Sequence, residues 1–489
     1  MIPQGVNIQH PDRLFIGGEW VAPRGGGQIE IVNPNSEEVV ARVAEAGKDD
    51  MDRAVAAARQ AFDHGPWPTT PPAERGAVLM KMIDHLEARV PELSAAWTAQ
   101  VGGLASFAPM MHGGAVAGLR GIAALGDSFD WVTQHKGQVV DTAILAREPV
   151  GVVVGIAPWN APFGIMANKV FYALVAGCPI IMKPSPETPL EAFIIAEAAE
   201  AAGMPAGTVN LVPGEREAAD HLIHSRDIDK VTFTGSSAAG MHIAGVCGSK
   251  MTRCTMELGG KSAAIIRDDF PIEAAAGILG NTITVMSGQV CAMLSRAIVT
   301  KDRHDELAEA IAGVMKGIKI GNSEDPETQL GPLAMKRQLD RVEMYIEEGK
   351  KTADLVTGGA RPAHMNKGYF IEPTLFANVD NTSRIAQEEI FGPVLCLIPA
   401  EDEEDAIRIA NESDFGLNGS VLTADNQAAY DISRRIRTGV MGQNGMRMEF
   451  GMPFGGFKQS GMGREGGPEG LWPYLETKTI LLDGAPTRL

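Results

Sequence analysis

Hydrophobic and polar positions follow two alternating patterns along the first half of the chain. Apolar residues that recur every three or four positions predict amphipathic helices, at residues 49–62, 73–88 and 190–202. Between them stand short, continuously apolar runs that predict buried strands, at residues 150–157, 179–183, 209–212 and 229–234. Strands that alternate with helices are typical of a parallel, doubly wound sheet.

The second half repeats this organisation from about Gly259 onward. Strands are predicted at residues 262–266, 297–300, 353–356, 370–376 and 394–399. Helices are predicted at residues 272–286, 302–316 and 337–349. A last strand, residues 477–482, mixes Thr and Lys with apolar residues and would expose a free sheet edge unless something covers it.

Composition narrows the class of protein. A chain of 489 residues predicts roughly three domains, and 45% hydrophobic residues suffice for large cores. A formal net charge of -18 argues against binding to nucleic acid or to an anionic membrane surface. Five cysteines do not form a disulfide framework, residues 1–13 lack a signal-peptide pattern, and no apolar run is long enough to span a bilayer. We therefore expect a cytoplasmic protein.

One cysteine stands in a setting that suggests chemistry. Cys291 closes the stretch Gly288-Gln289-Val290-Cys291 and has no second cysteine two or three positions away, which excludes a CxxC pair here. It is either a buried structural cysteine or a thiolate nucleophile, and a nucleophile needs a base and an oxyanion donor elsewhere. Glu257, in Glu257-Leu258-Gly259-Gly260-Lys261, and Asn160, in Pro158-Trp159-Asn160, are candidates for those two roles.

These three motifs and four others occur in the order found in the aldehyde dehydrogenase superfamily. The chain resembles its NAD(P)-dependent, hydrolytic members from about Phe15 to about Leu482. The other motifs are Lys183-Pro184-Ser185, Phe233-Thr234-Gly235-Ser236, Glu389-Ile390-Phe391-Gly392-Pro393 and Pro453-Phe454-Gly455-Gly456-Phe457-Lys458.

The resemblance implies an α/β fold with two doubly wound, Rossmann-like domains and a small β oligomerisation flap. The NAD-binding domain would comprise residues 1–130 and 149–258, and the catalytic domain residues 259–470. Residues 131–148 and 471–489 would form the flap and tail, which pair across subunits of a homodimer or homotetramer.

The cofactor site is not marked by a GxGxxG fingerprint, so the sequence pattern alone is weak evidence for a dinucleotide. The stretch 233–240 follows a predicted strand and opens a helix over residues 238–246; Ser236 or Ser237 is either a plain N-cap or part of an anion site. The resemblance implies that the cofactor pyrophosphate lies there. The cofactor residues it implies are Ile156, Trp159, Lys183, Ser185, Pro186, Gly235, Ser236, Gly240, Leu258, Glu389 and Phe391.

The choice between NAD and NADP rests on one departure from the family pattern. Many NAD-preferring members carry a glutamate three positions after the lysine that matches Lys183, whereas this chain has Pro186, with Glu187 one place later. A carboxylate near the ribose would repel a 2′-phosphate, and a proline cannot. NAD is expected, with NADP as the alternative.

The resemblance also implies a mechanism. Cys291 attacks the aldehyde to form a thiohemiacetal, whose oxyanion receives hydrogen bonds from the Asn160 amide and the Cys291 N–H. After hydride transfer Glu257 activates water to hydrolyse the thioester. Its presence argues against a coenzyme A-acylating enzyme, and the three residues together argue against a non-enzymatic structural relative. Lys169 and Glu465 match positions suggested for proton handling, although a structural role fits them equally well.

The substrate pocket is inferred from residues that flank the motifs. They are Ala161, Met166, Met286, Val290, Ala292, Met293, Met448, Phe450 and Phe454. Methionine suits an adaptable apolar wall, although these residues can equally pack the core. Because Ala161 stands where many members carry a bulky aromatic, we expect a roomy tunnel for a hydrophobic terpenoid, fatty or aromatic aldehyde. Arg447 leaves open an acidic semialdehyde, whose carboxylate it would pair.

Overall fold

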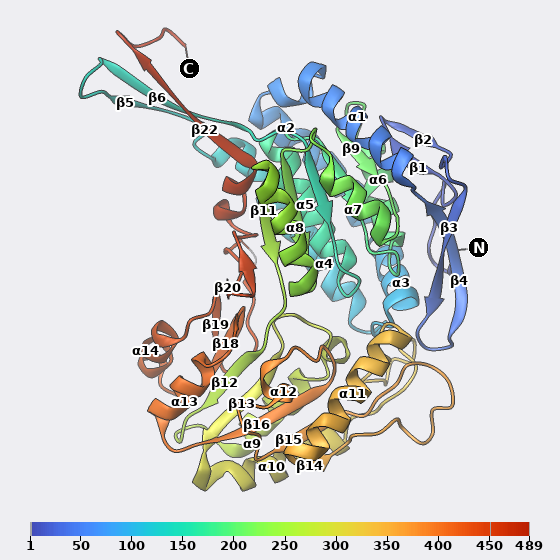
Figure 1. The fold of residues 1–489 in the computed structure, drawn as a ribbon, viewed down its shortest axis with the longest axis vertical. Helices are drawn as coiled ribbons and strands as arrows, with labels where there is room; N and C mark the ends of the chain where they lie inside the picture. The colour runs from blue at the N-terminus through green and yellow to red at the C-terminus, as the bar shows by residue number, and fades with distance from the viewer. Residues whose placement is uncertain (1, 450, 489) are drawn as a thin grey trace.

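The computed structural model describes residues 2–449 and 451–488 and places two α/β lobes one above the other, with a thin arm of strands projecting from the upper lobe (Figure 1). The upper lobe is built on an eight-stranded sheet, the first sheet, and the lower lobe on a seven-stranded sheet, the second sheet. The chain matches the expected mixed α/β class with parallel-stranded sheets.

The first sheet has the strand order β2-β1-β9-β8-β7-β10-β11-β21. Its five central strands, β9 to β11 in that order, are parallel, whereas β1, β2 and β21 join at the edges in antiparallel pairs. Strands β7, β8, β9 and β10 are buried at every position, which explains their continuously apolar sequences. The strands are β1 Leu14–Ile16, β2 Glu19–Val21, β7 Val153–Ile156, β8 Ile180–Lys183, β9 Val209–Leu211, β10 Lys230–Thr234, β11 Arg253–Glu257 and β21 Gly461–Met462.

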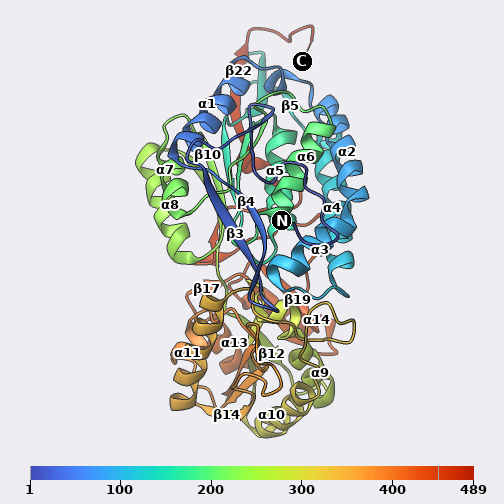
Figure 2. The ribbon, with the colours of Figure 1, turned by 90° about the vertical axis from the view of Figure 1, so that its right-hand side faces the viewer.

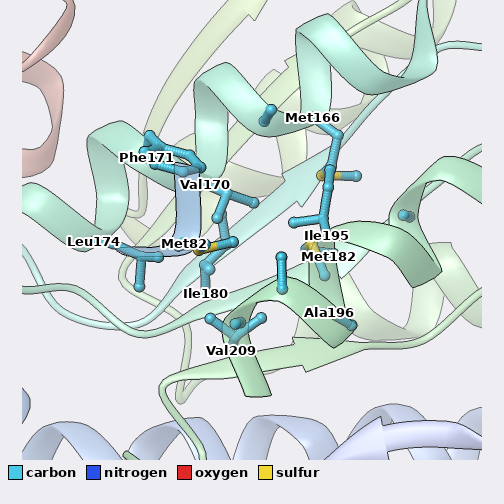
Figure 3. Packing of buried hydrophobic residues seen from close by; sticks show 14 of the residues in the cluster. Met82, Met166, Val170, Phe171, Leu174, Ile180, Met182, Ile195, Ala196 and Val209 are labelled. Carbon is cyan, nitrogen blue, oxygen red and sulfur yellow. The ribbon is translucent and has the colours of Figure 1, made fainter. Parts of the chain in front are cut away.

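Helices cover both faces of the first sheet (Figure 2). One face carries α2 Pro72–Ala88, α3 Val90–Val101, α4 Ala108–Ser128, α5 Pro162–Ala176 and α6 Leu190–Ala201. The other carries α1 Lys48–His64, α7 Arg216–His224 and α8 Ser237–Lys250. Figure 3 shows the core on the first face, where Met166 and Val170 of α5 and Ile195 of α6 meet Met182 of β8.

The second sheet has the order β14-β15-β16-β13-β12-β18-β19, and only the pair β14–β15 is antiparallel. Its strands are β12 Ser262–Ile266, β13 Leu294–Thr300, β14 Asp354–Thr357, β15 Thr374–Ala377, β16 Val394–Ala400, β18 Asn418–Leu422 and β19 Val440–Gln443. One face packs on α9 Ile272–Thr282 and α10 Lys301–Lys316. The other packs on α11 Lys336–Thr352, α12 Arg384–Gln387, α13 Glu403–Asn411 and α14 Asn426–Arg435.

The arm is a three-stranded antiparallel sheet of β5 Val132–Lys136, β6 Thr142–Pro149 and β22 Leu475–Leu482. Strand β22 pairs with β6 along its whole length, so the two predicted flap segments come together. Most of β22 is exposed, and its outer edge has no partner strand among the described residues. Two further antiparallel pairs remain: the hairpin of β3 Gly27–Asn33 with β4 Glu38–Glu45, and the short pair of β17 Phe415–Gly416 with β20 Phe457–Lys458.

Several predicted elements differ in their bounds from those observed, and for three of them the backbone shows a local cause. The helix expected over residues 272–286 ends at Thr282 and cannot reach 286, because Met286 and Ser287 have φ of 50° and 56°. The strand expected over 150–157 shortens to Val153–Ile156, since Gly151 has a φ of 130°. The strand expected over 370–376 begins only at Thr374, after Pro373, which has no backbone N–H to donate to a neighbouring strand.

The order of strands in the first sheet locates a crevice. The chain builds outward from β7 to β8 and β9, then returns to β10 on the other side of β7. Ligands of open α/β sheets bind at such a reversal, outside the carboxyl ends of the strands. The segments that follow β7 and β10 carry Asn160 and Ser236, so the reversal points to the predicted motifs. Among the described residues, no helix combines the length and apolar character needed to cross a membrane.

Candidate active site

A cleft of about 860 Å³ opens at the carboxyl ends of the first sheet and reaches the residues that precede strands β13 and β16 of the second. Its wall includes Cys291, Asn160 and most of the predicted cofactor residues. Those cofactor residues are Ile156, Trp159, Lys183, Ser185, Pro186, Gly235, Ser236, Leu258, Glu389 and Phe391. Motifs that are far apart in the sequence therefore meet in one cavity.

Cys291 reaches the cleft beside two glycines whose positions leave no room for a side chain. The turn Val285–Gly288 precedes it, and Gly288 has a φ of 74°. A Cβ atom on Gly288 would lie 2.2 Å from the carbonyl carbon of Gly392, and one on Gly260 would lie 2.4 Å from the carbonyl oxygen of Cys291. Both atoms belong to the backbone, which cannot move aside cheaply. The glycines of both motifs are therefore needed to place the cysteine.

The thiol lies among negative charges. Burial, followed by the charges of Glu389 and Glu257, raises the pKa of Cys291 to about 12. A thiol in this setting is protonated at neutral pH, and only its thiolate is a strong nucleophile. The site therefore needs a base that removes the proton as the thiol reacts.

Glu257 meets the requirements of such a base. It ends β11, is 4% exposed, and neither of its carboxylate oxygens has a hydrogen-bond partner among the described residues. Burial, followed by repulsion from Glu465, raises its pKa well above the ordinary value of 4.5. A Cβ atom on Gly455 would lie 2.7 Å from Oε1 of Glu257, so this glycine provides the room that the carboxylate occupies.

Asn160 is held at both its backbone and its side chain. Its Nδ2 donates to the carbonyl oxygen of Gln289 at 2.8 Å, and its own carbonyl accepts from the indole N–H of Trp97 at 2.9 Å. The side chain of Gln289 is fixed in turn, with Oε1 accepting from the N–H of Ala334 at 2.9 Å. The amide is thus tied to the segment that carries Cys291, and its second N–H is not used by these bonds.

Lys169 and Glu465 form a buried ion pair with each other. Lys169 is 0% exposed on α5 and donates to Oε1 of Glu465 and, at 3.2 Å, to Oγ1 of Thr232. Thr232 donates to the same oxygen of Glu465 at 3.1 Å. Neither residue lines the cleft, but the charge of Glu465 acts on Glu257. The pair is therefore placed to influence Glu257 rather than to touch a substrate.

The cleft wall near Cys291 also carries Glu389 and Phe391. Glu389 accepts the N–H of Gly260 at 3.0 Å, and burial raises its pKa to about 6. Phe391 has a φ of 63°, and its ring meets that of Trp159 edge-on with centroids 5.3 Å apart. The two aromatic rings and the carboxylate provide an apolar face with a single strong acceptor.

At the far end of the cleft, Ser236 caps α8 by accepting the N–H of Ala239 at 3.3 Å. Gly240 does not line the cleft; it packs against Leu258, which does. Pro186 and Glu187 both line the cleft. The carboxylate of Glu187 accepts a hydrogen bond from the hydroxyl of Ser185 and forms an ion pair with Arg337 of α11. A carboxylate is thus present one position after Pro186.

Known proteins resemble this chain in sequence and in fold. The model of the aldehyde dehydrogenase family matches residues 20–480. The chain belongs to the aldehyde dehydrogenase family. A geranial dehydrogenase from Castellaniella defragrans is 40% identical over 480 residues, covering 98% of this chain and 100% of that protein.

Solved structures of aldehyde dehydrogenases agree in fold. The structure of an aldehyde dehydrogenase from Mycobacterium tuberculosis in complex with NAD+ matches with a TM-score of 0.95 at 43% identity. The match covers 97% of this chain and 99% of the Mycobacterium chain. A variant of aldehyde dehydrogenase C from Pseudomonas syringae, in complex with NAD+ and octanal, has a TM-score of 0.94 at 36% identity and covers 99% of both chains.

The residues expected to form the substrate pocket of this aldehyde dehydrogenase do not all converge. Met166 was expected in the pocket but lies in the hydrophobic core between α5 and the first sheet (Figure 3), because α5 is buried on nearly every side. Ala292 is buried behind Cys291. Val290 and Met293 line a void of about 10 Å³ beside Glu389.

The other expected pocket residues lie nearer the surface. Ala161 is half-buried at the start of α5, and Met286 packs against the cluster around Trp97. Phe454 is half-buried, whereas Met448 is 59% exposed, and Phe450 lies outside the described residues. Arg447 is also exposed and donates from Nε to the carbonyl of Gln443 at 3.2 Å.

Several residues of the site escaped the sequence reasoning. Gln338 donates to the carbonyl of Phe391 at 2.7 Å, and Arg341 donates to that of Glu389, so α11 holds this wall of the cleft. The spacing of the two residues along one helix face is their only sequence signal. No group of three His, Cys, Asp or Glu side chains suited to a metal occurs among the described residues.

Proposed function

We propose that this aldehyde dehydrogenase oxidises a hydrophobic aldehyde to the carboxylic acid with NAD. The observation that carries the proposal is the meeting of Cys291 and Asn160 on one cleft wall, with Glu257 close enough to perturb the thiol. These residues supply a nucleophile, an oxyanion donor and a base, which are the three groups that covalent aldehyde oxidation requires.

The cleft suits NAD in size and in the donors it presents. Its volume is in the range of cofactor sites, about 300–1,000 Å³. The N-terminus of α8, at Ser236, offers backbone N–H groups to a pyrophosphate, and Glu389 offers an acceptor to a ribose hydroxyl. NAD, when bound, accepts the hydride that leaves the aldehyde carbon. NAD complexes of the Mycobacterium and Pseudomonas relatives support this assignment.

The residues of this chain divide the rest of the chemistry. Sγ of Cys291 bonds to the carbonyl carbon, and its proton passes to the carboxylate of Glu257. The carbonyl oxygen becomes an alkoxide that the Asn160 amide and the Cys291 N–H stabilise. Once the thioester has formed, Glu257 removes a proton from water, which attacks the acyl carbon and releases the Cys291 thiolate. Glu257 gives up the proton it took from the thiol before it acts on water; the carboxylate of Glu465, which is paired with Lys169 and whose charge acts on Glu257, is the acceptor that we propose for that proton.

Each predicted domain then has a task. We assign cofactor binding to residues 1–130 and 149–258 and catalysis to residues 259–470. The arm, from residues 131–148 and 471–489, would assemble a homodimer or homotetramer by pairing the open edge of β22. Light scattering of the full chain and of a chain that ends before β22 tests the assembly.

NAD is preferred over NADP on electrostatic grounds. Pro186 cannot repel a 2′-phosphate, but Glu187 lines the cleft one position later. The carboxylate of Glu187 would repel a 2′-phosphate. Its ion pair with Arg337 weakens that repulsion, because the paired guanidinium would attract the phosphate. We therefore propose a preference for NAD that is looser than one set by an unpaired carboxylate.

The substrate class is proposed from the relatives and from the apolar surroundings of the site. One relative is a geranial dehydrogenase, and another has been solved with octanal. Ala161, half-buried beside Asn160 at the start of α5, is too small to obstruct such a chain. A semialdehyde is the second candidate, because Arg447 is exposed and would be available to a substrate carboxylate.

The proposal is tested with a panel of aldehydes and both cofactors, following absorbance of the reduced cofactor. Cys291→Ala should abolish turnover and still bind NAD. Cys254 is a half-buried cysteine outside the cleft, so Cys254→Ala should keep turnover. Turnover that needs coenzyme A would overturn the hydrolytic reaction. Two results together would favour a semialdehyde over a hydrophobic aldehyde as the substrate. The kcat/KM of the wild type would fall as the aldehyde chain lengthens, and Arg447→Ala would lower kcat/KM for an acidic aldehyde only.

A further inference from the structure

The helix that starts beside Asn160 has no cap of its own. Helix α5 begins at Pro162, and Ala161 at its N-cap position makes no side-chain hydrogen bond. The first N–H groups of any helix lack partners within the helix and need acceptors from elsewhere. Because Asn160 lies two residues before α5, whatever fixes this helix start also fixes the asparagine.

A buried carboxylate from the next helix supplies the missing acceptor. Glu191 of α6 is 0% exposed, and its Oε2 accepts the N–H of Phe163 at 3.1 Å. The two helices lie side by side on the sheet, with Met166 of α5 and Ile195 of α6 in one cluster (Figure 3). A carboxylate at a helix N-terminus is favourable both as an acceptor and through the helix dipole.

His112 of α4 makes the buried carboxylate tolerable. Nδ1 of His112 lies 2.8 Å from the carbonyl oxygen of Ala108, which only accepts, so Nδ1 carries a proton. Nε2 lies 2.9 Å from Oε1 of Glu191, and one shared proton satisfies that contact. Whether the proton sits on nitrogen or on oxygen, the pair is neutral as a whole, and a buried charge without such a partner would be costly.

The same cluster touches Asn160 by a second route. The ring of Trp97 meets that of His112 edge-on, with centroids 6.0 Å apart. The indole N–H of Trp97 donates to the backbone carbonyl of Asn160 at 2.9 Å. The chain is therefore held at two points: at the carbonyl of Asn160 by Trp97, and three residues later by Glu191.

We propose that Glu191, neutralised by His112, is a positioning residue that fixes the amide of Asn160 toward the oxyanion. The inference rests on the proposed function, because it assigns Glu191 an effect only through the oxyanion donor. Glu191 touches neither the cleft nor the thiol, so it has no direct part in the chemistry.

Two substitutions at this position separate its contacts. Glu191→Leu should lower kcat/KM by about 10- to 100-fold, below the loss of about 10²–10³ that removal of an oxyanion donor causes. Glu191→Gln should restore most of that rate, since its carbonyl can accept from Phe163 and its amide can donate to Nε2 of His112. Alkylation of Cys291 by iodoacetamide, which forms no oxyanion, and the Kd for NAD should stay unchanged in both variants.

Glu197 offers a matched control on the same helix. It is buried, forms an ion pair with Arg89 and accepts the N–H of Gln9, but contacts nothing near Asn160. Glu197→Leu should lower Tm and leave kcat/KM within about twofold of the wild-type value, because Glu197 is distant from Asn160 and shares no partner with it. An equal loss of kcat/KM in Glu197→Leu and Glu191→Leu would show a general loss of stability and overturn the proposal.

A double-mutant cycle decides whether Glu191 acts through Asn160. In the Asn160→Ala background, Glu191→Leu should cause no further loss; an additive loss overturns the inference. If Glu191→Leu does not fold, Glu191→Asp takes its place in the double-mutant cycle. It keeps the carboxylate but moves its oxygens away from the N–H of Phe163, because its side chain is one carbon shorter. If Asn160→Ala itself keeps full activity, the proposed function fails. If only Asn160→Ala is slow and both Glu191 variants turn over normally, the inference fails alone.

Discussion

Gly240 contacts the cofactor cleft only through Leu258, and an alanine there tests that connection. A Cβ atom at position 240 would lie 2.3 Å from Cδ2 and 2.9 Å from Cδ1 of Leu258. Carbon atoms in contact are normally about 3.5–4.0 Å apart, so the overlap exceeds about 1 Å. Because the obstructing atoms end a flexible side chain, Leu258 should rotate away before the backbone of α8 moves. Leu258 lines the cleft, so it would rotate into the space proposed for NAD.

The expected cost follows from overpacking. Such a change typically costs about 1–3 kcal/mol. If the displaced side chain must be returned for NAD to bind, this cost appears in the cofactor affinity, at tenfold for each 1.4 kcal/mol. The Kd of Gly240→Ala for NAD should therefore rise about 5- to 150-fold, measured by calorimetric titration, while Tm changes by no more than a few degrees.

Two further variants make this prediction specific. Gly245→Ala lies on the same helix, and nothing lies within 4 Å of its new Cβ. It should leave the Kd unchanged and stabilise the helix by about 0.5–1 kcal/mol. Leu258→Ala, added to Gly240→Ala, should remove the overlap and bring the Kd to that of Leu258→Ala alone. An unchanged Kd together with a large fall in Tm would refute the reasoning, because the helix, not Leu258, would then have moved.

Four other outcomes are expected. Glu257→Gln should show a pre-steady-state burst of reduced cofactor followed by slow turnover; loss of the burst would assign Glu257 to the activation of the thiol instead. Because burial raises the pKa of Glu257 above 4.5, the stability it contributes is present below pH 4.5 and lost as pH rises through the folded pKa. The Tm of Glu257→Gln should therefore exceed that of the wild type by a margin that grows above pH 4.5, and a constant difference contradicts this. Glu187→Gln should free Arg337 and lower the NAD/NADP ratio of kcat/KM about tenfold, whereas an unchanged ratio shows that other residues decide; Pro186→Glu should raise it. Ala161→Phe should lower kcat/KM for long or branched aldehydes and spare short ones, and a uniform loss would remove Ala161 from the pocket.

The fold was predictable where burial leaves a plain pattern. Strand β8, Ile180–Lys183, is buried on both faces and reads as one apolar run, and α1 shows a clear helical period. Helix α4, Ala108–Ser128, was missed because repeated glycines and alanines dilute its apolar period. Helix α5 was missed for the opposite reason, since nearly all its residues are buried and no polar face marks the period.

The site was predictable only as far as motifs extend. The positions of Cys291 and Asn160 in one cleft follow from their motifs and the family resemblance. Whether a flanking residue faces that cleft depends on the phase of its helix or turn, which is why Met166 lies in the core and Gly240 behind Leu258. The contact between His112 and Glu191 joins residues 79 positions apart and leaves no local pattern.

The two carboxylates beside Cys291 differ in a way that supports different roles. Both raise the pKa of the thiol, so charge alone does not separate them. Glu389 accepts the N–H of Gly260 and lies on the cleft wall, where it is held in one orientation. Glu257 has no such partner for either oxygen among the described residues, and burial raises its pKa above 4.5 just as it raises that of Glu389, so the difference lies in their contacts. A carboxylate that must take a proton from a thiol and later one from water has to change its contacts between the two steps. Only the unanchored one, Glu257, is free to do so, and the anchored one is suited to holding a ligand.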